Sequence, residues 1–146
     1  MILILNNLSP SPLRGEGLRE RGRTPVNTHY NQEQGIVGES LAETFLKQNG
    51  FKILERRYRT SYGEIDLIAQ KKQCLYFVEV KWRKTREFGD PLEAITKGKI
   101  KHLTKAAYYF LEKNPQFKKD NDLQLAAIAV REYDEANKIE LVLILP

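Results

Sequence analysis

The sequence predicts an α/β fold in which a sheet lies between helices. The first observation is the order of the periodic segments, which runs helix, three strands, helix, strand, strand. The second is the length of 146 residues with 41% hydrophobic content, which suits one domain with a buried core. With a helix on each side, a sheet of this kind forms an α/β sandwich.

Residues 1–31 are predicted to be a disordered extension, and residues 32–146 to be the folded domain. Residues 6–31 are rich in Pro, Gly, Arg, Ser and Asn and show no apolar period. The alternative is that this segment is translated sequence upstream of the true start. The apolar residues 1–5 are too few, and lack the basic flank, for a secretory signal.

The first helix is expected to begin near residue 32. Its apolar positions share one helical face, and Asn49-Gly50 supplies a stop. Glu39 lies at the margin of this face, where it is either a third metal-site carboxylate or a plain exposed glutamate. The residues of the apolar face are Val37, Leu41, Ala42, Phe45 and Leu46.

Three strands follow, over residues 51–59, 64–69 and 75–82, with a turn at residues 60–63. If the second and third strands form a hairpin that closes on Lys72-Gln73, their register is fixed. Asp66 then lies opposite Glu79, and Glu64 opposite Lys81. A slip of one residue would move these side chains to the other face of the sheet.

A second helix is expected over residues 90–113. Asp90-Pro91 and Glu93 are helix-start signals, and Asn114-Pro115 ends the pattern. Gly98 is expected to divide this helix into two pieces. Two closing strands are predicted at residues 123–130 and 139–145, with a polar turn at residues 134–137.

Asp66, Glu79 and Lys81 stand out because they place charge inside apolar strands, which is costly unless the charge is paired or metal-bound. A hard cation such as Mg²⁺ takes one or two protein carboxylates with water and phosphate oxygens, and Asp66 and Glu79 could supply them. Lys81 would orient the attacking water or neutralise charge at phosphorus. Glu64 shares a face with Asp66 and is assigned a supporting role. The alternatives are solvated strand-end charges or a buried salt bridge.

Positive charge surrounds this predicted acidic site. Arginines crowd the end of the first strand and the loop after the third, and lysines recur every four residues along the second helix. Such a ridge either grips phosphates or is a solvated face. The residues predicted to bind nucleic acid are Arg56, Arg59, Arg83, Lys84, Arg86, Lys97, Lys99, Lys101 and Lys105.

The cysteine and histidine content excludes other classes of site. Cys74 is the only cysteine, so no internal disulfide can form and a reducing cytoplasm is the expected location. With only His29 and His102 beside it, a structural zinc site is not expected. No apolar run approaches the length of a membrane span, so no membrane partner is expected.

Four motifs occur together in this sequence. They are Gly38-Glu39-x2-Ala42, Arg56-x2-Arg59 before Gly63-Glu64-Ile65-Asp66-Leu67-Ile68-Ala69, Phe77-Val78-Glu79-Val80-Lys81-x-Arg83, and Lys99 with Ala106-Ala107. Together these motifs resemble the YraN-like family of small bacterial proteins in the PD-(D/E)XK nuclease-like superfamily. The resemblance covers about residues 34–111, and more weakly the C-terminus.

The resemblance implies a restriction endonuclease-like αβββαβ core with a mixed central sheet flanked by helices. It implies that Asp66 is the metal-binding aspartate of the superfamily. Glu79 and Lys81 match its (D/E)-x-K element, and Glu39 matches its helix-borne acid.

Three functions follow as hypotheses. The first is a metal-dependent endonuclease that hydrolyses phosphodiester bonds in DNA, including branched or damaged DNA, with Mg²⁺ or Mn²⁺. The second is a catalytically inactive nucleic-acid-binding module of the same fold. The third is an assembly protein, a homodimer formed by edge-to-edge pairing of residues 139–145.

Overall fold

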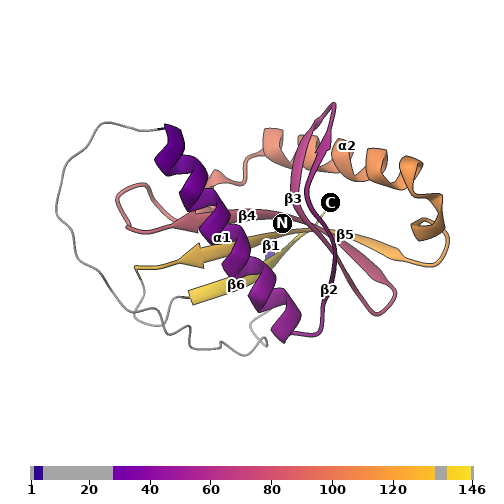
Figure 1. Cartoon of the computed structure of the whole chain (residues 1–146), viewed down its shortest axis with the longest axis horizontal. Helices are drawn as coiled ribbons and strands as arrows, with labels where there is room; N and C mark the ends of the chain where they lie inside the picture. Colours follow the sequence, from indigo (N-terminus) through magenta and orange to yellow (C-terminus); the bar gives the residue numbers. More distant parts are fainter. Residues whose placement is uncertain (1, 5–27, 134–137, 146) are drawn as a thin grey trace.

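The computed structural model describes residues 2–4, 28–133 and 138–145. Within these ranges a six-stranded sheet carries two long helices (Figure 1). The elements are β1 (Ile2–Ile4), α1 (Thr28–Gln48), β2 (Lys52–Thr60), β3 (Gly63–Lys71), β4 (Cys74–Arg83), η1 (Pro91–Ala94), α2 (Lys97–Lys113), η2 (Pro115–Phe117), β5 (Asp122–Arg131) and β6 (Lys138–Ile144).

The sheet is mixed, with strand order β1-β6-β5-β4-β3-β2. Strands β4 and β5 are parallel, because α2 carries the chain back between them, and the other neighbours are antiparallel. The predicted α/β class and the mixed sheet flanked by helices are confirmed.

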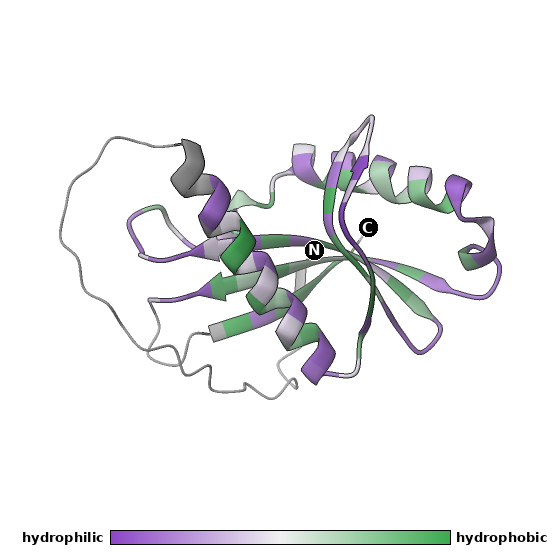
Figure 2. Cartoon of the chain, in the orientation of Figure 1, coloured by the Kyte–Doolittle hydropathy of each residue, from purple (hydrophilic) through white to green (hydrophobic). Residues whose placement is uncertain are grey.

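Each face of the sheet is covered by one helix. Alternate residues of a strand point to opposite faces. Ala126 and Ile128 accordingly pack with Phe45 and Leu46 of α1, whereas Ala127 packs with the α2 side chains. Figure 2 shows the matching pattern on the helices, where apolar and polar residues alternate along each ribbon. The two apolar clusters therefore fix the helices on opposite sides.

The β3–β4 hairpin has the predicted register near its turn. Lys71 pairs with Cys74, Lys72 takes the turn conformation with φ +54°, and pairing continues to Leu67 and Val78. Beyond that point the pairs expected for Asp66 with Glu79 and for Glu64 with Lys81 are not formed. The two strands part there, because the β2–β3 tip bends toward α2 (Figure 1).

Contacts at the hairpin tip hold this bend. The Tyr62 ring meets the Tyr109 ring edge-on at 6.4 Å between centroids. The backbone carbonyl of Tyr62 lies 3.0 Å from Nδ1 of His102. Both partners belong to α2, so the tip is tied to that helix and a fork opens between β3 and β4.

The N-terminal segment differs from the prediction at both of its ends. Ile2–Ile4 form β1, which pairs with β6, and α1 begins at Thr28, before residue 32. An apolar Ile-Leu-Ile run favours a strand, and the β6 edge offers it backbone partners. Residues 5–27, and the polar turn expected at residues 134–137, lie outside the described residues.

The segment predicted as the second helix is divided, but not at Gly98. Asp90 caps the short η1 turn by accepting a hydrogen bond from the Leu92 amide. Thr96 then caps α2, its hydroxyl accepting from the Lys99 amide at 3.2 Å. Two successive caps explain the break, and Gly98 lies in the first turn of α2.

Candidate functional site

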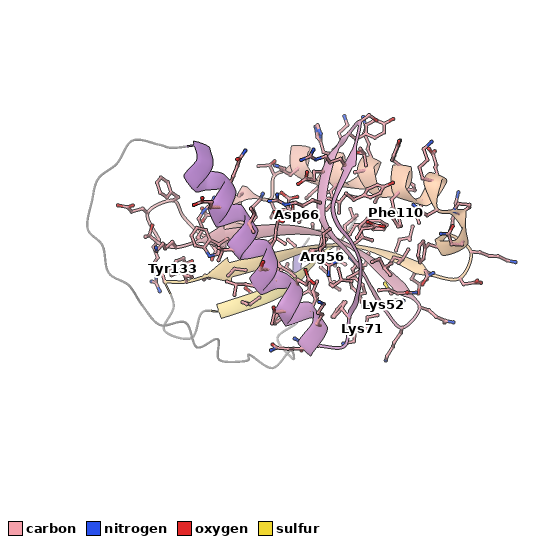
Figure 3. The ribbon with its side chains drawn as sticks, in the orientation of Figure 1. Lys52, Arg56, Asp66, Lys71, Phe110 and Tyr133 are labelled. Carbon is pink, nitrogen blue, oxygen red and sulfur yellow. The ribbon has the colours of Figure 1, made fainter. Side chains whose placement is uncertain are left out.

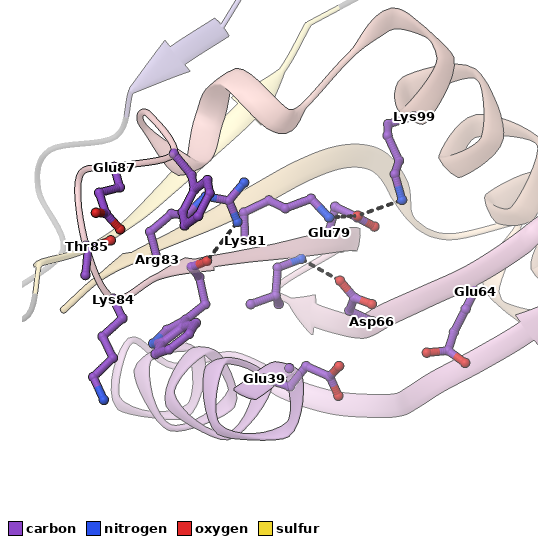
Figure 4. A pocket seen from close by; sticks show the side chains of 14 residues that line it. Glu39, Glu64, Asp66, Glu79, Lys81, Arg83, Lys84, Thr85, Glu87 and Lys99 are labelled. Carbon is purple, nitrogen blue, oxygen red and sulfur yellow. Dashed lines mark hydrogen bonds and ion pairs between the residues drawn. The ribbon is translucent and has the colours of Figure 1, made fainter. Parts of the chain in front are cut away.

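The fork between β3 and β4 is the centre of the candidate site (Figure 4). Where the strand ladder ends, the Val80 amide donates a hydrogen bond of 2.7 Å to Oδ2 of Asp66. The Asp66 carboxylate thus takes the place that a backbone carbonyl would hold in a continued ladder. Its position depends on the bend of the hairpin.

Glu79 and Lys81 lie on one face of β4, as their spacing predicts. Lys81 Nζ donates to Glu79 Oε1 at 2.5 Å, and Glu79 is only 9% exposed. Lys99 Nζ, from the start of α2, lies 3.6 Å from the same Glu79 oxygen (Figure 4). The buried salt bridge considered as an alternative is therefore present, and α2 supplies a second cation.

Asp66 is a largely buried carboxyl group beside a second acid, Glu79. Burial, followed by the negative charge of Glu79, raises the pKa of Asp66 to about 7, while the Val80 hydrogen bond opposes this rise. Lys81 opposes it only weakly. A carboxylate in this state gains from any cation that binds beside it.

The donor set that fits a metal consists of Asp66 and Glu79. Two carboxylates with open space for water suit Mg²⁺, which keeps part of its hydration shell. No group of three His, Cys, Asp or Glu side chains in the described ranges is arranged to hold a metal. Glu39, expected as a third ligand, instead accepts hydrogen bonds of 2.7 and 3.2 Å from Arg57. Its role at a metal stays a prediction.

Glu64 has a different partner from the one expected. The β2–β3 register sets it opposite Arg59, and Arg59 Nε donates to its carboxylate at 3.1 Å. The predicted approach to Lys81 is absent because β3 has already left β4 at this level. Glu64 still borders the cavity described next.

An open cavity of about 750 Å³ joins these groups. Its wall comes from α1, β3, β4, the loop after β4 and the start of α2. The residues that line it are Gly35, Glu39, Glu64, Asp66, Glu79, Val80, Lys81, Trp82, Arg83, Lys84, Thr85, Glu87, Phe88 and Lys99. Acids and bases share its surface with apolar side chains, so it is a cleft of mixed charge.

The cations predicted to bind nucleic acid fall into three groups. Arg83, Lys84 and Lys99 line the cavity. Lys97, Lys101 and Lys105 form an exposed row on α2.

The third group consists of arginines whose guanidinium groups contact other side chains of the protein. Arg59 binds Glu64, and Arg56 forms two hydrogen bonds to Glu43. The Arg56 guanidinium, together with Lys47, lowers the pKa of Glu43 to about 2. Arg86 lies 5.1 Å from the centre of the Tyr133 ring.

Sequence patterns missed three residues at the site. Arg57 holds Glu39 from a backbone position with φ +48°, a conformation that no motif marks. Trp82 lines the cavity, and its buried Nε1 has no hydrogen-bond partner among the residues that the structure describes. Phe88 lies in a polar loop and is 77% exposed. The run of arginines around Arg57 and the position of Phe88 beside Gly89 are the sequence features that could have pointed to these two residues.

Comparison with known protein families agrees with this geometry. The profile described as "Uncharacterised protein family UPF0102" matches residues 38–143, which include the fork and most of the sheet. The chain belongs to the UPF0102 family. This is the YraN-like family of the sequence resemblance, and UPF0102 proteins are members of the restriction endonuclease-like superfamily. The fold of this UPF0102 chain is therefore nuclease-like.

Relatives in several bacteria share much of the chain. The UPF0102 protein of Syntrophomonas wolfei is 43% identical over 102 residues, which are 70% of this chain and 89% of that protein. The UPF0102 protein of Geotalea daltonii is 40% identical over 124 residues, or 85% and 88% of the two chains. That of Desulfosudis oleivorans is 47% identical over 88 residues, or 60% and 72%.

A solved structure of Pyrococcus furiosus SfsA in complex with Ca²⁺ has a TM-score of 0.30 and 15% identity. The matched region covers 77% of this chain and 62% of the SfsA chain.

The part of the chain that the structure describes contains no helix with the length and apolar character needed to span a membrane.

Proposed function

We propose that this UPF0102 protein is a metal-dependent endonuclease that hydrolyses phosphodiester bonds in DNA. The observation that carries the proposal is the meeting of Asp66, Glu79 and Lys81 at the fork, inside one open cavity. Lys84 and Lys99 in the same cavity suit a phosphate backbone. Branched or damaged DNA is the substrate we favour.

Asp66 and Glu79 would hold Mg²⁺ or Mn²⁺, which supplies an acidified water and charge stabilisation at phosphorus. The chain's own groups would prepare the site. Val80 fixes the Asp66 carboxylate through its amide, and Lys81 holds Glu79 in place. Lys81, whose Nζ donates to Glu79 Oε1 at 2.5 Å, would be placed to donate to a non-bridging phosphate oxygen or to the attacking water.

The test is cleavage of branched, single-stranded and duplex DNA by purified protein in Mg²⁺ or Mn²⁺. Asp66→Asn keeps the size of the side chain and an acceptor for Val80, and Lys81→Met keeps the aliphatic stem. Each should lower the cleavage rate by about 10²- to 10⁴-fold. Lys118→Met, at an exposed lysine after η2, is the matched control and should cleave like the wild type. Equal cleavage by all four proteins would reveal a contaminant and end the proposal.

A catalytically inactive binding module is the second candidate. The observation that favours it is the occupied state of the acids, with Glu79 bound by Lys81 and near Lys99, and Glu39 bound by Arg57. This alternative predicts salt-sensitive DNA binding without turnover in either metal, and an unchanged affinity after Lys81→Met.

A further inference from the structure

Phe88 is a large apolar side chain in an unexpected place. It is 77% exposed, more than any other exposed large hydrophobic side chain among the described residues, and it borders the cavity that contains Asp66 and Glu79. Exposed apolar side chains are common singly on protein surfaces. Phe88 differs because it lines a cleft that also contains five carboxylates, those of Glu39, Glu64, Asp66, Glu79 and Glu87.

The loop that carries Phe88 is held at both sides of the residue. The Gly89 amide donates to the Arg86 carbonyl at 3.1 Å, and Gly89 takes φ +76°, which glycine adopts without strain. Asp90 then receives two hydrogen bonds, of 2.8 and 2.9 Å, from the buried Arg131. The Phe88 ring is therefore presented from an anchored turn.

Arg131, the buried partner of Asp90, is itself held by a second carboxylate. Arg131 is 6% exposed and also donates to Glu140 of β6 at 2.9 Å. A guanidinium between two carboxylates at such distances holds a defined geometry. The loop backbone next to Phe88 is thereby tied to the end of β5.

We propose that Phe88 stacks on an unpaired base of a bound nucleic-acid strand. This inference rests on the proposed function, since it takes nucleic acid as the ligand and adds the class of substrate. Lys84 and Lys99 line the same cavity and suit the backbone phosphates. Glu87 beside the ring disfavours a phosphate there, so a base face is the part of the strand that suits Phe88.

Whether a base face is exposed then decides which nucleic-acid structures Phe88 can bind. In a continuous duplex both faces of every base are covered by neighbouring bases. An exposed phenyl ring can reach a base face only where a base is unstacked, as in a single strand, a gap or a branch point. Such structures are the substrates that Phe88 favours over intact duplex.

Binding of fluorescent oligonucleotides by the full chain tests this assignment. Affinity for a single strand, a forked duplex and a continuous duplex is measured in Ca²⁺, and gels confirm that each oligonucleotide stays intact. Phe88→Ala and Phe88→Leu should bind the single strand and the fork roughly tenfold more weakly, and the duplex almost normally. Phe88→Trp should bind as well as the wild type. Tyr108→Ala, at an exposed aromatic on α2 outside the cavity, is the matched control and should change nothing.

The comparison of leucine with tryptophan separates stacking from apolar contact, because leucine keeps the bulk and lacks a π face. Thermal unfolding checks that the variants fold. Normal binding by Phe88→Leu, or an equal loss for the duplex, would overturn the stacking role, even if the wild type cleaves DNA. Phe88-dependent binding without cleavage would refute the nuclease and keep the stacking role. If the protein bound none of the three oligonucleotides, both the nuclease and the stacking role would be refuted.

Discussion

At the scale of single residues, Asp66 shows how position changes chemistry. An aspartate on a solvated strand has a pKa near 3.8, whereas burial and the negative charge of Glu79 raise the pKa of Asp66 to about 7. The folded protein therefore holds a proton at Asp66 that the unfolded chain has already released. This difference links the ionisation of Asp66 to folding and to metal binding.

The linkage has a definite sign. Between about pH 4 and pH 7 the folded state binds more protons at Asp66 than the unfolded state, so the free energy of unfolding falls as pH rises through this window. Asp66→Asn removes the contribution of Asp66 to this pH dependence. Without metal, the wild type should lose a few kcal/mol relative to Asp66→Asn between these pH values, at about 1.4 kcal/mol per pH unit at most. Urea unfolding of both proteins at a series of pH values measures the difference.

Added Mg²⁺ should reduce the same difference, because a cation beside Asp66 favours the ionised carboxylate. Lys118→Met serves as a control for general effects of salt and pH. Parallel stability curves for wild type and Asp66→Asn would mean that Asp66 titrates normally.

At the scale of elements, the contact between α1 and β4 forms one side of the site. Gly38 of α1 lies against Trp82, and a Cβ at Gly38 would come within 2.8 Å of the Trp82 Cβ. Neither atom can rotate away. The glycine therefore sets how closely α1, with Glu39, approaches the strand that carries Glu79 and Lys81.

Gly38→Ala should destabilise the protein by about 1–3 kcal/mol through this clash. Gly35→Ala is the matched control on the same helix, since a Cβ at Gly35 meets no atom within 4 Å. The control should be neutral or gain about 0.5–1 kcal/mol from helix propensity. Denaturant unfolding of the two variants decides the matter. Equal stability would show that α1 can move off β4 without loss.

At the scale of the whole molecule, charge is distributed unevenly. The net charge of +5 is modest, but Lys97, Lys101 and Lys105 form an exposed row on α2 that begins beside the Lys99–Glu79 contact. Figure 3 shows Lys52 and Lys71 well away from Asp66. Under the proposed function, the row on α2 is the lysine group expected to contact phosphates outside the cavity.

Replacing Lys97, Lys101 and Lys105 by alanine should weaken DNA binding and flatten its salt dependence. Each phosphate contact contributes about 0.9 to the slope of log K against log salt for duplex DNA, so a loss of about 2–3 is expected if all three bind. A triple alanine variant at Lys52, Lys72 and Lys119 changes the charge equally and is the control. Identical slopes for the two triple variants would show that only net charge matters.

The edge of the sheet bears on self-association. Homodimerisation through residues 139–145 stays a prediction, but β1 pairs with Val142, Leu143 and Ile144 on that edge. A second copy would have to displace β1 or use the rest of β6. Cytoplasmic location likewise stays a prediction.

The sequence alone predicted five of the six described strands, the presence of both helices and the hairpin register near its turn, because apolar periods and turn residues act locally. It also identified Asp66, Glu79 and Lys81, since charges inside apolar strands are conspicuous. Only the tertiary structure decided that β3 separates from β4 at Asp66 and that Phe88 borders the cavity. It also decided that Arg57 pairs with Glu39 and that Lys99 approaches Glu79. These contacts join segments distant in the chain, and their geometry follows from how the hairpin and helices pack, which no local pattern records.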